Sequence, residues 1–215
     1  MLAISPNVTG LSMATPATEI SPQVQPWQAV LDFWFGLPDS PEYGMARAEW
    51  FRKSDAFDEE IRHRFGALHE QALAGALDDW TQTPLGACAL IVVLDQFSRN
   101  LYRGLAKAFA GDARALSVAR RLVEAGDDQR LPTPQHRVFV YLPFEHDESL
   151  ESQHASLALY EQLAKASGLV DNLDYARKHA VIIERFGRYP HRNAALGRMS
   201  TPEEVAFLKQ PGSSF

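Results

Sequence analysis

Cysteine is almost absent from the sequence, which has Cys88 alone among 215 residues. A single thiol forms no disulfide within the chain and cannot build a cysteine-based zinc site. Cys88 stands between Ala87 and Ala89 in an apolar run, where a free cysteine behaves as a small hydrophobic residue. We therefore expect a buried core thiol, because a nucleophilic cysteine needs a base and a polar setting.

Long hydrophobic stretches are also missing. No apolar run approaches the roughly 18 residues that a membrane-spanning helix needs. The first 24 residues contain no lysine or arginine and no compact apolar segment, so the parts of a secretory signal are not there. The sequence thus predicts no membrane association and a cytoplasmic protein.

Lysine is scarce, with 5 lysines against 16 arginines, and the net charge is −6. Neutralising the phosphates of a nucleic acid requires a basic surface, so we expect no nucleic-acid partner. Arginine binds carboxylates and phosphates in a planar fork that lysine cannot reproduce. The arginine bias therefore predicts ordered ion pairs or an anion site.

Several motifs that would identify a chemistry are lacking. The sequence has no sustained two-residue alternation of apolar and polar residues, which argues against strands. It has no glycine-rich phosphate loop, dinucleotide fingerprint, nucleophile elbow or His-Glu-x-x-His motif. We predict an all-α fold without a cofactor.

The predicted organisation is a disordered N-terminal extension over residues 1–24 and one all-helical domain over 25–215. Residues 1–24 are rich in serine, threonine and proline, a composition typical of disorder. Local signals predict helix starts at Ser54 or Asp55, at Thr83, and at Thr201, where Thr-Pro-Glu-Glu has the spacing of a capping box. Short connections between neighbouring helices favour stacked antiparallel helical hairpins.

Three further expectations concern single segments. We predict a short helix over 45–51, one amphipathic helix over 105–125, and an interruption at Pro143, because proline removes a helix hydrogen bond. We also expect the large aromatic residues to form the core. They are Trp27, Trp34, Phe35, Trp50, Phe51, Trp80, Phe97, Phe109, Phe144 and Phe186, with Trp50 and Trp80 alternatively bordering a pocket.

Three separated polar stretches carry the candidate chemistry: 94–104, 141–153 and 179–193. In the first, Asp95, Arg99 and Arg103 are four residues apart, which places them on one face of a continuous helix. Asp95 follows an apolar run from Leu85 to Leu94 and is expected near the interior, where a carboxylate needs a partner. The second stretch is rich in acids and the third in arginines.

Our first interpretation is a small-molecule or anion site, with an enzyme as one form of it. Arginine suits carboxylate or phosphate recognition, and His146 or His191, oriented by Glu148 or Asp95, suits proton transfer. The predicted ligand-binding residues are Arg99, Arg103, His146, Glu148, Arg188, His191 and Arg192.

The alternative is a purely structural network, because the five arginines of the three stretches can neutralise acids of the same stretches, namely Asp95, Glu145, Asp147, Glu148 and Glu184. Its predicted members are Asp95, Glu184, Arg185 and Asn193, and the function would then be that of a scaffold or peptide-binding module. A metal site is not predicted, since Glu151 and His154 form one Glu-x-x-His pair where di-iron bundles use two.

Three long motifs support a family resemblance. Leu-Asp-Gln-Phe-Ser-Arg-Asn-Leu-Tyr-Arg-Gly at 94–104, Tyr-Leu-Pro-Phe at 141–144 and Arg-Phe-Gly-Arg-Tyr-Pro-His-Arg-Asn at 185–193 resemble the bacterial domain-of-unknown-function family 924. The sequence resembles that family from about residue 27 onward, and this implies a tetratricopeptide-like helical fold with no established activity. The family tends to read Pro-Phe-Met-His-Ser-Glu where this chain has Glu145 and Asp147 on either side of His146.

Overall fold

The computed structural model describes residues 25–213, and every regular element in that part of the chain is helical. The predicted extension at 1–24 lies outside the described residues. None of the described helices is both long and apolar enough to cross a membrane. The α-helices are α1 (Gln28–Phe35), α2 (Asp55–Ala74), α3 (Pro84–Ile91), α4 (Ser98–Leu101), α5 (Asp112–Glu124), α6 (Pro134–His146), α7 (Leu150–Ser167), α8 (Val170–Phe186) and α9 (Pro202–Phe207).

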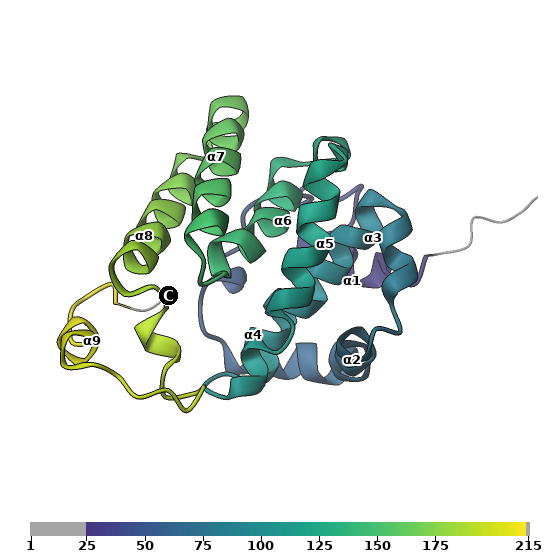
Figure 1. The fold of residues 1–215 in the computed structure, drawn as a ribbon. Helices are drawn as coiled ribbons and strands as arrows, with labels where there is room; N and C mark the ends of the chain where they lie inside the picture. Colours follow the sequence, from purple (N-terminus) through teal and green to yellow (C-terminus); the bar gives the residue numbers. More distant parts are fainter. Residues whose placement is uncertain (1–24, 214–215) are drawn as a thin grey trace, which may run out of the picture.

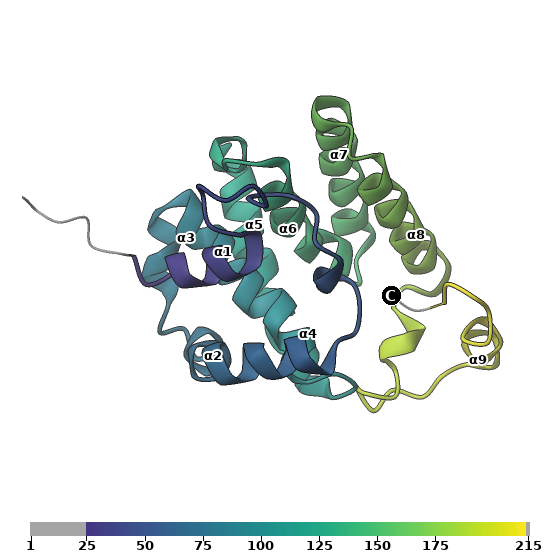
Figure 2. The same ribbon diagram turned by 180° about the vertical axis from the view of Figure 1, so that it is seen from behind.

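Helices that follow one another in the chain also lie beside one another in space. The order α3, α5, α6, α7, α8 is a row of successive neighbours, with α1 packed on α3 and α2 packed on α4 (Figure 1). Seen from behind, α2 runs along the base of the molecule at the left, and α9 lies at the right edge next to the end of α8 (Figure 2). Gly168 and Leu169 alone join α7 to α8.

The predicted helix starts agree with the structure. Ser54 accepts a hydrogen bond from the Phe57 N–H, and Thr83 accepts one from Gly86. Thr201 and Glu204 form the complete capping box. These signals depend on residues within one helical turn, so the sequence is sufficient to predict them.

The centre of the fold is a continuous helical rod that is not α-helical throughout. α3 passes into a π-helical segment, Val92–Phe97, which passes into α4. Every residue from Gly86 to Ser98 is buried, including the free thiol of Cys88, as predicted. A π-helical turn holds more residues than an α-helical turn and occurs often at functional sites. Asp95 and Arg99 keep the predicted four-residue spacing and pair at 3.0 Å, but α4 ends at Leu101, so Arg103 lies beyond the helix.

Some sequence predictions were wrong. Helix α6 continues through Pro143 to His146, because proline's fixed φ is compatible with a helix and only one hydrogen bond is lost. The predicted helix over 105–125 is a 3-10 turn, Ala106–Phe109, followed by α5. The predicted helix over 45–51 is reduced to a 3-10 turn, Ala48–Trp50.

Aromatic side chains form much of the core. Trp34 is fully buried and contacts Trp50, Phe97 and Phe139, with ring centroids 5.3–6.1 Å apart. Phe51 is an exception to the predicted core, since it is exposed. It follows the 3-10 turn at the surface, where its ring borders Trp50 and Phe139.

His136, on α6, is a buried histidine away from the polar stretches, and its Nδ1 lies 2.7 Å from the Thr133 hydroxyl. Burial lowers its pKa to about 4. The unfolded chain, with an ordinary pKa of about 6.5, takes up the proton first as the pH falls. His136 therefore makes stability decrease between about pH 6.5 and pH 4, and has no such effect above that window.

We expect the unfolding temperature of His136→Gln to fall less between pH 7 and pH 4.5 than the unfolding temperature of the wild type does. Differential scanning calorimetry at both pH values measures this difference. His154→Gln, at an exposed position on α7, is the control and should behave as the wild type. An undiminished acid sensitivity in His136→Gln would contradict the assignment.

Candidate functional site

A polar centre forms where the π-helical segment, the end of α6, the start of α5, α8 and the turn after α8 meet. Asp95 comes from the π-helical segment and is fully buried. The His146 Nδ1 lies 2.7 Å from Asp95 Oδ1, and Arg99 Nη1 lies 3.0 Å from the same oxygen. Gln96 donates to Asp95 Oδ2 at 2.5 Å. Burial alone would raise the pKa of Asp95, but Arg99 and His146 outweigh it and hold that pKa below the usual range.

Asp112, the first residue of α5, connects two arginines. Arg99 binds it as a fork, with N–O distances of 2.9 and 3.1 Å. Arg192 Nη1 approaches Asp112 Oδ2 at 3.3 Å from the turn after α8. The ion pairs therefore form a series of alternating charge that connects three segments distant in sequence: Asp95, Arg99, Asp112 and Arg192.

Arg192 is only 6% exposed, which is unusual for a charged residue. Its guanidinium carbon lies 4.8 Å from the Phe109 ring centroid and 4.6 Å from that of Tyr189. Its Nε is buried and has no hydrogen-bond partner among the described residues. Burial, and then the nearby charge of Arg99, lower the pKa of Arg192.

Glu145 and His179 lie on the other side of His146. The Glu145 Oε1 is 3.0 Å from the His179 Nδ1, and both side chains are buried. Burial, and then the charge of Asp95, raise the pKa of Glu145 to about 8. Burial and the neighbouring His146 lower the pKa of His179 to about 3.

The backbone around Glu145 is fixed by two side chains. The Tyr189 hydroxyl donates to the Glu145 carbonyl at 2.5 Å, and Gln153 Nε2 donates to the same carbonyl at 2.9 Å. Gln153 also donates to the Tyr189 hydroxyl at 3.1 Å. The end of α6 is thus held in place by α7 and by the segment after α8.

The structure brings four of the seven predicted ligand-binding residues into this neighbourhood. Arg99, His146 and Arg192 make the contacts described above. His191 lies beside Tyr189 with ring centroids 5.5 Å apart and the rings tilted by 36°, and burial and Arg192 lower its pKa to about 4. Of the two orienting carboxylates considered for a histidine, Asp95 is the one that contacts His146.

The other three predicted residues pair elsewhere. Arg103 binds Asp58 of α2 at 2.5 and 2.8 Å. Glu148 accepts a fork from Arg198, at 2.5 and 2.9 Å. Arg188 forms a fork with Glu204, at 2.7 and 2.8 Å.

The predicted network residues are also divided. Asp95 is at the centre, whereas Asn193 donates to Glu204 at 3.3 Å and Arg185 pairs with Glu203 at 2.8 Å. Glu184 is exposed on α8. Sequence reasoning left Asp112 and Arg198 out, because partners this distant in sequence give no local signal.

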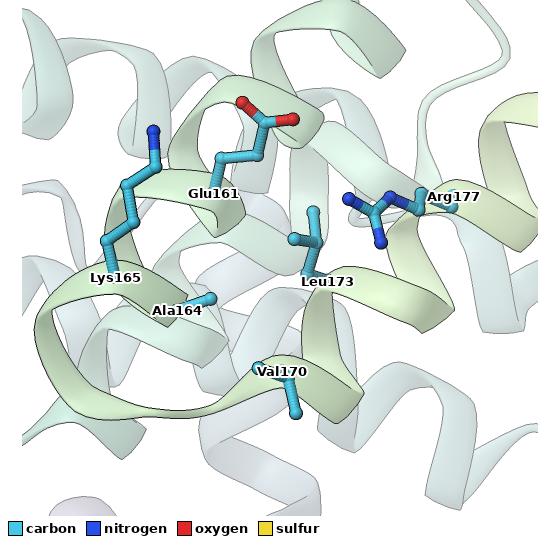
Figure 3. Close-up of a pocket in the computed structure, with 6 residues that line it drawn as sticks. All are labelled: Glu161, Ala164, Lys165, Val170, Leu173 and Arg177. Atoms are coloured by element: carbon cyan, nitrogen blue, oxygen red, sulfur yellow. The ribbon is translucent and has the colours of Figure 1, made fainter.

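Two surface cavities lie away from the polar centre. One, of about 340 Å³, is between α7 and α8 and is lined by Glu161, Ala164, Lys165, Val170, Leu173 and Arg177. Leu173 stands between Glu161 and Arg177 there (Figure 3). The other, of about 370 Å³, includes Trp27 and Trp80 in its walls, which fits the alternative considered for Trp80.

A protein of unknown function from Agrobacterium tumefaciens, ATU0120, has a similar solved structure. It is 38% identical, the similarity covers 85% of this chain and 96% of that one, and the TM-score is 0.74. None of the curated proteins matches this chain.

The family comparison covers most of the chain. Residues 30–212 match the family described as "Bacterial protein of unknown function (DUF924)". This range contains all three of the polar stretches and all the helices from α2 to α9. The chain therefore belongs to the DUF924 family of bacterial proteins.

Proposed function

We propose that the polar centre binds a small anion, a phosphate or a carboxylate, through Arg192 and Arg99. The observation that carries this proposal is the guanidinium of Arg192, which is 6% exposed, has one ion-pair contact at 3.3 Å, and keeps a buried Nε without a partner. A buried donor left unsatisfied costs about 1–3 kcal/mol. An anion that accepts from this group would recover that free energy.

The surroundings of Arg192 favour negative charge. Arg99 is close enough to lower the pKa of Arg192, and both arginines lower the pKa of His191 and of His146. Guanidinium groups bind carboxylates and phosphates in a planar fork. An oxyanion in contact with this group relieves the repulsion that the arginines and histidines exert on one another.

Phosphate should raise the unfolding temperature of the wild type, measured by calorimetry against chloride of equal ionic strength. At a phosphate concentration 100 times Kd, the expected stabilisation is about 2.7 kcal/mol, or roughly 5–10 °C for a domain of this size. We expect Arg192→Met to lose this response, because it removes the buried donors and keeps the aliphatic contacts with the two rings.

Arg188→Met is the matched control. It removes an arginine of the same stretch that pairs with Glu204, and it should keep the phosphate response. The proposal would be contradicted if phosphate did not raise the unfolding temperature of the wild type. An equal rise in a folded Arg192→Met would also contradict it.

A second candidate is a peptide-binding scaffold with tetratricopeptide-like stacking of helical hairpins, in which the polar centre is structural. The observation that favours it is the row α6, α7, α8, with a surface cavity between α7 and α8 (Figure 3). The alternating charges of Asp95, Arg99, Asp112 and Arg192 also suit a structural network. In that case Arg192→Met lowers stability equally with and without phosphate.

A further inference from the structure

We propose that Glu145, His146 and His179 form a binding site for a divalent transition-metal ion. One ligand atom from each of the three lies within 4.8 Å of those of the other two. Two imidazoles and one carboxylate are a donor set that Zn²⁺ and Fe²⁺ use in proteins, with further positions left for water or substrate. This inference does not depend on anion binding, although His146 belongs to both sites.

The hydrogen bonds of the two histidines fit metal ligation. A histidine that binds a metal usually donates its other N–H to a carboxylate or a backbone carbonyl. The His146 Nδ1 contacts Asp95 Oδ1 at 2.7 Å, and the His179 Nδ1 contacts the Tyr175 carbonyl at 2.9 Å. Both acceptors require a proton on Nδ1, so each ring keeps its lone pair on Nε2.

The position of Glu145 also favours a cation. Its side chain is 4% exposed, so the carboxyl group lies in the interior of the fold. Among residues 25–213 its only ion-pair contact is with His179, and no arginine or lysine of that range pairs with it. A divalent ion between Glu145 and the histidines would take the place of the proton on this buried carboxyl group, since metal ligands must be deprotonated.

An ion between the three side chains requires them to move closer together. Metal–ligand distances of about 2.0–2.2 Å place the ligand atoms of a tetrahedral site roughly 3.3–3.6 Å apart. The ligand atoms of the three residues lie within 4.8 Å of one another, so they would have to approach by up to about 1.5 Å. Glu145 Oε1 now lies 3.0 Å from the His179 Nδ1, and its side chain must rotate toward Nε2 to share an ion with that ring.

The experiment is an isothermal titration of chelator-treated full-length protein with ZnCl₂. We expect one Zn²⁺ ion to bind per protein chain. Asp95→Asn should weaken the affinity by about 10–100-fold, the usual effect of losing an outer-sphere partner. Glu145→Gln and His179→Gln should lower the Zn²⁺ affinity by at least the same factor. His154→Gln, at an exposed histidine of α7, should keep wild-type Zn²⁺ affinity. Arg192→Met should bind Zn²⁺ at least as tightly as the wild type, because it removes a positive charge near His146 and His179.

This pattern separates the two proposals, because Arg192→Met removes anion binding and Glu145→Gln removes metal binding. Unchanged Zn²⁺ affinity in a folded Glu145→Gln would overturn the metal site, as would binding that His154→Gln abolishes. Should the variants not fold, the histidine ring ¹⁵N spectrum of the wild type decides. Zn²⁺ must shift the Nε2 signals of two buried histidines, and their constancy at saturating Zn²⁺ would overturn the proposal.

Discussion

Replacing Asp95 with asparagine is expected to lower the free energy of unfolding by about 3–5 kcal/mol, the usual cost of breaking a buried ion pair by removing one partner. Asp95 is fully buried and compensates Arg99 at 3.0 Å. Asparagine has nearly the same volume, so the loss reports on charge and not on a cavity. Urea unfolding at pH 7 gives the difference directly.

The control for this variant is Asp174→Asn, on α8. Asp174 pairs with Arg177 at 2.9 Å, but both side chains are more than half exposed, and such pairs contribute little. We expect a change within about 0.5 kcal/mol. Equal stability of Asp95→Asn and the wild type would show that the centre does not need this charge.

Gly111→Ala is expected to destabilise the protein by about 3 kcal/mol, at the upper end of what overpacking costs. A Cβ at Gly111 would lie 2.2 Å from the Leu94 carbonyl oxygen. The φ of Gly111 is −88°, so the glycine is required by close approach and not by backbone conformation. The overlap is with backbone, which cannot rotate away, and the strain would displace the neighbouring Asp112.

Gly66→Ala provides a control of opposite sign. Gly66 lies within α2, and a Cβ there would have no neighbour within 4 Å. Alanine in a helix interior is favoured over glycine by roughly 0.5–1 kcal/mol, so this variant should be more stable than the wild type. Urea unfolding of both variants measures the contrast, and a Gly111→Ala protein as stable as the wild type would contradict the close packing of α5 on the rod.

The sequence predicted those features of the fold that depend on near neighbours. The cap at Ser54, the capping box at Thr201 and the buried Cys88 follow from residue types within one turn. The π-helical segment did not, because the insertion of a residue into a helix is set by tertiary packing and leaves no periodic signal. The end of α4 at Leu101 was not predicted either, and Arg103, expected on the face of Asp95, lies beyond that helix and pairs with Asp58.

The candidate site was predictable in part for the same reason. The apolar run before Asp95 indicated its burial, and Arg99 is one turn away. The link from Arg99 through Asp112 to Arg192 could not be found, because many acids and arginines of this chain could pair with one another. Only the three-dimensional arrangement selects Asp112 for Arg192, Glu204 for Arg188 and Arg198 for Glu148.

The most direct measurement of the central claim, that Arg192 presents a free buried donor to an anion, is the arginine Nε–Hε NMR spectrum. The Arg192 signal is assigned by its loss in Arg192→Met, and the Arg188 signal by its loss in Arg188→Met. We predict that phosphate shifts the Arg192 resonance in a saturable manner and leaves that of Arg188 in place. An Arg192 resonance that stays constant throughout the titration of the folded protein would contradict the account.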